Sequence, residues 1–306
     1  MCKCKCCLMI KRTLYFGNPA YVSVRHKQLC VRKPGEDEEK TVPIEDIGMV
    51  IADHPRITFT QATVTSLQEN NAVILWCGSD HLPVSMSLPF ANNDTYTERI
   101  RYQLAASEPL KKQLWKQTIE AKLANQAKVL KRLGAPSPTI ERMISKIGSG
   151  DPQNYEGRAA AIYWQSILTI PYSVNRGRDE GGANSLFNYG YAVLRAVLAR
   201  NLVSSGCLPA MGIHHRNKYN AFCLADDIME PYRPIVDQYI VAFLEENPEF
   251  DGNLTPDIKK YLLQIPVLDI NIKGKTSPLM VGASRTSASL MDCFSGKARK
   301  ILYPEL

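Results

Sequence analysis

The change in hydrophobic spacing near residue 90 places the strongest constraint on how this chain folds. Between residues 13 and 88, eight short apolar runs, several alternating with polar residues, are separated by turn sequences such as Gly17-Asn18-Pro19. This pattern is typical of β-strands, although residues 61–70 read better as a short helix. After about residue 91, apolar residues recur at helical spacing. We therefore predict an α+β fold, with a small sandwich-like N-terminal β-sheet domain followed by a larger all-α domain.

The predicted boundaries follow from this change of pattern. We expect a cysteine-rich extension over 1–8, a β domain over 9–90, a linker over 91–97 and an α-helical domain over 98–306. In the last of these, helices are expected at 108–133, 154–168, 183–205, 224–246, 255–264 and 279–298. The extension, with its CxCxCC pattern, lacks the two-residue gaps and the second ligand pair of a structural zinc site. We expect it to be disordered.

Composition and charge narrow the class of protein. The 306 residues are 45% hydrophobic and 22% charged, as in ordinary globular proteins. No apolar run approaches the about 20 residues that cross a bilayer, and no export signal is evident, so we expect a cytoplasmic protein. Basic and acidic residues number 11 and 11 in 1–100, 15 and 7 in 101–200, and 11 and 12 in 201–306. The net charge of +8 in the middle third favours an anionic partner, nucleic acid first, with solubility as the alternative.

Residues 206–234 contain the residue types of a divalent-metal site. The candidates there are His214, His215, Asp226, Asp227 and Glu230. Asp227 and Glu230 are three residues apart, so a helix places both carboxylates on one face. A loop imidazole and helical carboxylates suit Mg²⁺ or Mn²⁺. Acidic residues in a first helical turn are also favoured by the helix dipole and by capping, so this stretch alone leaves a structural role open.

Glu156 opens another predicted helix and is followed by small residues at 157 and 159–161. Such neighbours let a second helix or a ligand approach closely. They fit a buried carboxylate, which requires a partner such as a metal ion. A solvated charge is the ordinary alternative for a lone glutamate.

Basic residues are concentrated on one predicted helix and one loop. Between 111 and 132 the helix has a single acid and seven cations: Lys111, Lys112, Lys116, Lys122, Lys128, Lys131 and Arg132. Arg176 and Arg178 flank a glycine in a loop, and arginine offers planar, bidentate donors to phosphate oxygens. We expect Arg176, Arg178, Lys116 and Lys122 to contact a DNA backbone. The two arginines could instead support the fold or a dimer interface.

Five segments together resemble the CRISPR-associated spacer integrases, the Cas-one family, and in particular its type II subgroup. They are TVPIEDIGMVI (41–51), SEPLKKQLW (107–115), NYEGRAAAIYW (154–164), NSLFNYGYAVLRA (184–196) and GIHHRNKYNAFCLADDIMEPYRPIVD (212–237). The resemblance runs from about Lys11 to the C-terminus. It implies a β-sheet N-terminal domain and a helical catalytic domain, in agreement with the hydrophobic spacing.

The resemblance also implies a site and partners. The family's Glu-Gly, Gly-x-x-His and Asp-x-x-Glu motifs correspond to Glu156, His215 and Glu230, which would be catalytic ligands of Mg²⁺ or Mn²⁺, with Asp227 as a supporting acid. His214 leaves the choice of imidazole open, and the motif spacing favours His215. The implied partners are double-stranded DNA (protospacer and repeat array), a second copy of the chain in a homodimer, and the Cas-two protein in a four-to-two complex. The type II effector nuclease is a further candidate partner.

The function that the resemblance implies is insertion of protospacer DNA into a repeat array by attack of a 3′-hydroxyl on a phosphodiester, or hydrolysis by water. One alternative is a catalytically silent DNA-binding scaffold, which gives no reason for Glu156, His215 and Glu230 to meet. A second is a metallohydrolase for small phosphorylated substrates, which would not need the basic middle third.

Overall fold

The computed structural model describes residues 11–89, 93–168 and 182–306. The predictions for the cysteine-rich start and for Arg176 and Arg178 lie outside these residues. The chain divides into two compact units, Met1–Asn92 and Asn93–Leu306. The division falls between residues 92 and 93, within the stretch expected to be a linker. Each unit is described by itself below, as an N-terminal and a C-terminal unit.

The N-terminal unit contains two four-stranded sheets, in the orders β1-β5-β7-β8 and β4-β3-β2-β6. In the first sheet β1, β5 and β7 run parallel, and β8 is antiparallel to β7. The strands are β1 (Arg12–Phe16), β2 (Ala20–Arg25), β3 (Gln28–Arg32), β4 (Glu39–Pro43), β5 (Ile47–Ala52), β6 (Ile57–Phe59), β7 (Val73–Cys77) and β8 (Pro83–Ser87). Side chains from both sheets share one apolar core, as in a sandwich.

The predicted short helix of this unit is also present. It is α1 (Gln61–Glu69), and a 3₁₀ turn, η1 (Ile44–Asp46), precedes β5. The helix begins where it does because the Thr60 hydroxyl accepts a hydrogen bond from the backbone N–H of Thr63 at 3.3 Å. The buried Leu67 on α1 joins the core between the sheets.

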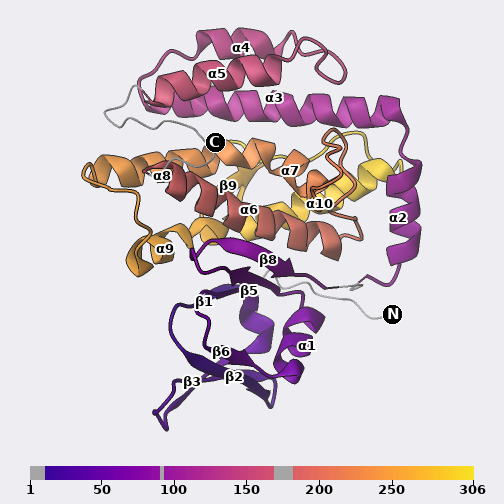
Figure 1. Ribbon diagram of the computed structural model, residues 1–306. Coiled ribbons are helices and arrows are strands. Elements are labelled where there is room, and N and C mark those ends of the chain that lie inside the picture. Colours follow the sequence, from indigo (N-terminus) through magenta and orange to yellow (C-terminus); the bar gives the residue numbers. More distant parts are fainter. Residues whose placement is uncertain (1–10, 90–92, 169–181) are drawn as a thin grey trace. The chain divides into compact units, whose positions relative to one another are not determined.

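The C-terminal unit is mostly helical (Figure 1). Its helices are α2 (Tyr96–Ala105), α3 (Glu108–Arg132), α4 (Pro138–Ile144), α5 (Tyr155–Leu168), α6 (Asn184–Ser204), α7 (Cys223–Met229), η2 (Glu230–Tyr232), α8 (Arg233–Glu246), α9 (Pro256–Leu262), η3 (Ile265–Val267) and α10 (Leu279–Phe294). Helix α6 has buried apolar side chains on all its faces. It packs against α7, α8 and α10. The long helix α3 packs on α4, α5, α8 and η2. Among the described helices, none combines the length and the apolar character needed to cross a membrane.

The helix predicted over 224–246 is interrupted, and this corrects the sequence-based expectation. The chain forms α7, then the 3₁₀ turn η2, then α8, with Pro231 and Pro234 at the starts of the last two. Proline lacks an N–H and clashes with the preceding turn, so it cannot continue an α-helix but fits its first positions. The break places Glu230 at the turn between two helices.

The C-terminal unit is not purely helical either. Strands β9 (Asp269–Ile272) and β10 (Lys275–Pro278) form an antiparallel hairpin. The two residues between them, Lys273 and Gly274, have φ values of 51° and 72°. Positive φ at both central positions is the requirement of the tightest hairpin turn. The buried Ile270 and Ile272 anchor the hairpin against α10.

Candidate metal centre

The first turn of α5 fixes the backbone of Glu156. The carboxylate of Asp151 accepts hydrogen bonds from the N–H groups of Tyr155 (2.9 Å) and Glu156 (2.8 Å), and the Asn154 side chain accepts one from Gly157 (3.1 Å). A Cβ atom on Gly157 would lie 2.8 Å from the Asn154 side chain. The small residue after Glu156 therefore allows this cap to form.

The Gly-x-x-His segment wraps around Asp227, which is fully buried on α7. The Asp227 carboxylate accepts hydrogen bonds from the N–H groups of Ile213 (2.7 Å), His214 (2.9 Å) and His215 (3.2 Å). A Cβ atom on Gly212 would lie 2.4 Å from the His215 carbonyl oxygen and 2.8 Å from Asp227 Oδ2. Only glycine therefore lets the loop close around this carboxylate.

Asp227 also orients the imidazole of His215. The distance from Nδ1 to Asp227 Oδ1 is 2.6 Å. Because an ionised carboxylate only accepts, Nδ1 carries the proton, and the lone pair of Nε2 is free for another partner in the neutral ring. The hydrogen bond to Asp227 raises the pKa of His215, while burial acts in the opposite direction. A carboxylate behind a histidine is the arrangement that orients metal-binding imidazoles.

His214 has a different environment. Its ring stacks on Trp115 of α3, with centroids 4.0 Å apart and planes at 1°. Trp115 is buried and also meets the edge of His215, at 5.8 Å between centroids. Burial lowers the pKa of His214. The aromatic contacts thus brace the loop, while His215 alone of the two rings is held by the buried acid.

Glu230 is buried at the break between α7 and η2 and is held by two cations. Arg233 Nε lies 3.0 Å from Oε1, and Lys122 Nζ lies 2.5 Å from Oε2. Burial by itself would raise the pKa of Glu230, but Arg233 and Lys122 outweigh it and bring the pKa to about 2. Glu230 is therefore a carboxylate at neutral pH.

Lys122 joins the two glutamates. Its ammonium contacts Glu156 as well as Glu230, and the residue is only 6% exposed. This corrects the expectation that Lys122 contacts a DNA backbone at the helix surface, because its charge is buried and already paired. Burial alone would lower the pKa of Lys122, but the two carboxylates outweigh it and raise the pKa.

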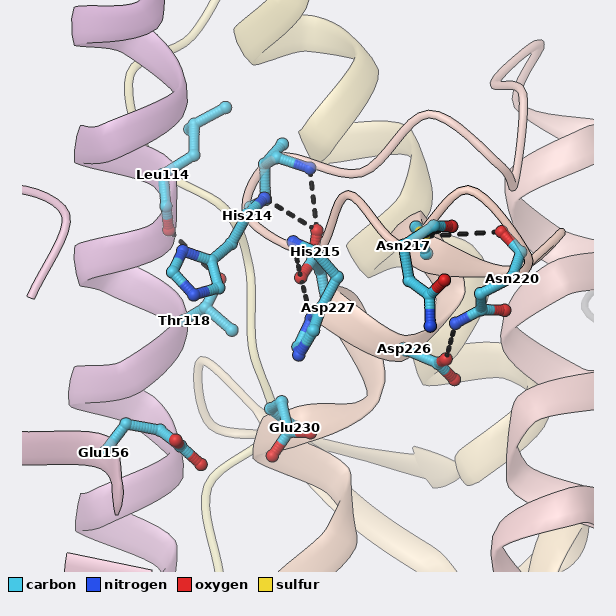
Figure 2. Close-up of polar contacts among 12 residues, drawn as sticks. Leu114, Thr118, Glu156, His214, His215, Asn217, Asn220, Asp226, Asp227 and Glu230 are labelled. Carbon is cyan, nitrogen blue, oxygen red and sulfur yellow. Dashed lines mark hydrogen bonds and ion pairs between the residues drawn. The ribbon is translucent and has the colours of Figure 1, made fainter. Parts of the chain in front are cut away.

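The three residues expected to bind metal face one region of the C-terminal unit. Figure 2 shows the Glu156 and Glu230 side chains pointing toward one another, with the His215 ring directed toward Glu230. The charge of Glu230 raises the pKa of His215, and His215 in turn lowers that of Glu230. Within residues 11–89, 93–168 and 182–306, no group of three or more His, Cys, Asp or Glu side chains is arranged so that it could hold a metal ion. The ammonium of Lys122 lies between the carboxylates instead.

The other cations of α3 are used partly within the fold. Four of the seven pair with carboxylates: Lys111 with Glu108, Lys116 with Glu120, Lys122 with Glu156 and Glu230, and Lys131 with Glu141. Lys116 keeps a third of its side chain exposed, at 3.6 Å from Glu120. The basic side chains of this helix therefore form ion pairs within the fold, and they are not all available to an anionic partner.

Sequence reasoning did not anticipate Arg233, Trp115 or Asp151 as parts of the site. The sequence did contain an indication for Arg233, because it follows Glu230 at the i,i+3 spacing that is typical of a helical ion pair. It contained none for Trp115, since its stack on His214 joins residues 99 positions apart. The position of Asp151 in a loop just before a predicted helix is typical of a cap.

Comparison with solved structures gives the class of protein to which this fold belongs. A casposase bound to integration product superposes with a TM-score of 0.79 and 19% identity, covering 95% of this chain and 92% of that one. A chain of a Cas6-RT-Cas1–Cas2 complex gives a TM-score of 0.74 and 18% identity, covering 97% of this chain and 36% of that one. The fold is thus shared with casposases and Cas1-containing proteins.

Sequence comparison defines the family. The profile described as CRISPR associated protein Cas1 matches residues 14–251. The CRISPR-associated endonuclease Cas1 of Neisseria meningitidis serogroup C (strain 8013) is 34% identical over 301 residues, 97% of each chain. This chain belongs to the Cas1 family, a family that includes CRISPR-associated endonucleases. The resemblance to the Cas-one family is confirmed, and the type II subgroup is consistent with the Neisseria relative.

Proposed function

We propose that this chain is a divalent-metal-dependent DNA integrase and endonuclease of CRISPR adaptation, which inserts protospacer DNA into the repeat array. The observation that carries the proposal is the pairing of Glu156 and Glu230 on one shared cation, beside an imidazole whose Nδ1 is bound by a buried acid. Family membership and the endonuclease name of the Neisseria relative support the same reaction class.

The donor set fits Mg²⁺ or Mn²⁺. Two carboxylates and one neutral imidazole nitrogen are ligands that these ions accept. Glu156, Glu230 and His215 through Nε2 would hold the ion, which supplies positive charge to the scissile phosphate and to the leaving oxygen when bound. The ammonium of Lys122, which contacts both carboxylates, supports a cation at this place.

The protein's own groups prepare this site. Asp227 keeps the proton of His215 on Nδ1, which leaves Nε2 as the nitrogen that would bind the ion. Arg233 favours the ionised form of Glu230. The nucleophile is a DNA 3′-hydroxyl in integration and water in hydrolysis, and in both cases the attacked group is a phosphodiester.

DNA binding is proposed to rest on backbone contacts. Arg176, Arg178 and Lys116 would contact phosphates with little reading of sequence, as basic side chains do. Sequence preference would come from deformation of the repeat or from other proteins. The basic middle third of the chain supports this, as does the likeness to a casposase bound to integration product.

The proposed partners are those that the resemblance to the family implies. A second copy of the chain and the Cas2 protein would complete a four-to-two integration complex, with the type II effector nuclease as a further partner. The likeness to a chain of a Cas6-RT-Cas1–Cas2 complex supports the pairing with Cas2.

Strand transfer by purified protein tests the proposal. A labelled protospacer and a supercoiled repeat plasmid are incubated with and without Cas2 across a Mg²⁺ and Mn²⁺ titration. We expect Glu156→Ala, His215→Ala and Glu230→Ala each to abolish integration and plasmid nicking while DNA affinity stays close to wild type. Glu141→Ala is the matched control, because this carboxylate pairs with Lys131 at the surface. Activity retained by all three variants would overturn the proposal.

The same assay separates the alternatives. A silent DNA-binding scaffold predicts no metal-dependent nicking by the wild-type protein. A small-phosphate hydrolase predicts that phosphomonoesters compete with duplex DNA at similar concentrations. Binding to duplex DNA that such compounds do not displace favours the integrase.

A further inference from the structure

We infer that Lys122 is the resident counter-cation of the metal centre: its ammonium holds Glu156 and Glu230 together when no divalent ion is bound, and an incoming ion must displace it. The inference rests on the proposed function, in which these two glutamates bind the ion. It concerns what the chain does before the metal enters.

The burial of Lys122 supports this role. Lysine is almost never fully buried unless it is paired, because removing an ammonium from water costs several kcal/mol. Lys122 is 6% exposed, and its charge contacts both carboxylates. Removal of this one cation would leave the buried Glu230 and the partly exposed Glu156 without the charge that both contact.

The atoms involved show why the ammonium and a metal ion compete. Arg233 takes Oε1 of Glu230, and Lys122 takes Oε2 together with Oε1 of Glu156. Both oxygens of Glu230 are thus contacted by a cation, so an ion that binds this carboxylate would compete with Lys122 or Arg233. This agrees with the finding that no ready three-ligand group occurs among the described residues.

The two cations around Glu230 differ in their freedom to move away. The Arg233 guanidinium lies over the ring of Tyr191, 4.7 Å from its centroid, which fixes its position. Lys122 holds its charge on a flexible four-carbon stem. Displacement therefore falls on Lys122, while Arg233 stays and keeps Glu230 in place.

The test compares Lys122→Met with the wild-type chain in EDTA and in Mn²⁺. Methionine keeps an unbranched side chain of similar length without the charge. We expect a lower Tm than wild type in EDTA, a larger rise of Tm on adding Mn²⁺, and Mn²⁺ affinity tighter by about tenfold or more in an EPR titration, because no ammonium competes. Lys131→Met, which breaks a surface ion pair of the same helix, is the control and leaves the Mn²⁺ affinity unchanged.

A merely structural ion pair predicts something else: a fall of Tm that is the same with and without Mn²⁺, and unchanged Mn²⁺ affinity. That result would overturn the inference. Failure of the proposed function is distinct, because Mn²⁺ binding would then be unaffected by Glu156→Gln. The inference alone fails when Mn²⁺ binding depends on Glu156 and not on Lys122.

A measurement on the wild-type chain covers the case in which Lys122→Met does not fold. In protein labelled with ¹⁵N at the lysine amino groups, the buried ammonium gives a resonance protected from exchange. We expect diamagnetic Mg²⁺ to shift this resonance or to abolish its protection. A Lys122 resonance unchanged at saturating Mg²⁺ would contradict displacement.

Discussion

Asp227 shows how one buried side chain organises the site at the scale of single residues. Its two oxygens accept three backbone N–H groups of the Gly-x-x-His segment and the imidazole of His215. These bonds compensate the burial of its charge, and they explain the glycine at 212, where any Cβ would clash. A metal ion bound by His215 would therefore depend on Asp227 without touching it.

Asp227→Asn tests this dependence. An amide has one acceptor oxygen, and its NH₂ group would face donors, so the loop and the tautomer of His215 are both disturbed. We expect Mn²⁺ affinity to fall about 10- to 100-fold and the free energy of unfolding to fall by about 1–3 kcal/mol, measured by EPR titration and urea unfolding. Glu141→Gln, at a surface acid that pairs with Lys131, is the control. Wild-type Mn²⁺ affinity in Asp227→Asn would contradict this role.

The raised pKa of His215 predicts a pH dependence. Because the folded chain holds this proton more tightly than the unfolded chain, the pair stabilises the fold below about pH 6.5, and that contribution is lost as the pH rises through the raised pKa. Metal needs the neutral ring, so Mn²⁺ affinity should increase with pH over the same range. An affinity that is constant between about pH 6 and pH 8 would argue against His215 as a ligand.

At the scale of elements, the ends and breaks of helices place the functional groups. Glu156 lies in the capped first turn of α5, and Glu230 lies at the break that Pro231 enforces. The long helix α3 supplies Trp115 to the histidine loop and, two turns later, Lys122 to the glutamates. The site is therefore assembled from α3, α5, the α7–η2–α8 segment and the histidine loop of the C-terminal unit.

The cap of α5 gives a prediction at this scale. Asp151 has a φ of 50° and accepts from two N–H groups, so Asp151→Ala loses both bonds and places alanine in the left-handed region. We expect a loss of about 1–2 kcal/mol in the free energy of unfolding. Asp151→Asn, which tolerates this φ and keeps one acceptor oxygen, should lose less in the same urea titration. Equal losses in the two variants would show that the cap is not the cause.

The strands and helices show which parts of the fold could be predicted from the sequence. Each of the eight apolar runs between residues 13 and 88 contains a strand, because short apolar runs bounded by turn residues, several of them alternating, are typical of sheets. The break at Pro231 and the hairpin at Lys273-Gly274 were missed inside stretches interpreted as helical or as connections. In the site, the resemblance to the motifs of the Cas-one family singled out Glu156, His215 and Glu230. The burial of Lys122 was not predictable, since a lysine on a basic helix looks the same in sequence whether it faces solvent or two carboxylates.

At the scale of the whole molecule, charge connects the chain to its proposed substrate. Residues 101–200 have a net charge of +8, which already counts the acids that pair with Lys111, Lys116 and Lys131 of α3. This net positive charge is what the proposed contacts with the DNA backbone would draw on.

The salt dependence of binding measures those contacts. If basic side chains hold the phosphate backbone, the logarithm of DNA affinity falls linearly with the logarithm of salt concentration, by about 0.9 for each phosphate neutralised. We expect Lys116→Ala to reduce this slope by about one and to weaken binding to all duplex sequences alike. Fluorescence anisotropy between low and physiological salt checks both. A DNA affinity that does not change with salt concentration would contradict binding through the phosphate backbone.

The central claim is that Glu156, His215 and Glu230 hold one divalent ion. An EPR titration of the purified chain with Mn²⁺ tests it most directly, because the signal of free Mn²⁺ is lost on binding. We predict one strong site per chain that disappears in each of Glu156→Gln, His215→Ala and Glu230→Gln, with circular dichroism showing that the variants remain folded. Binding of Mn²⁺ that survives all three substitutions would contradict the account.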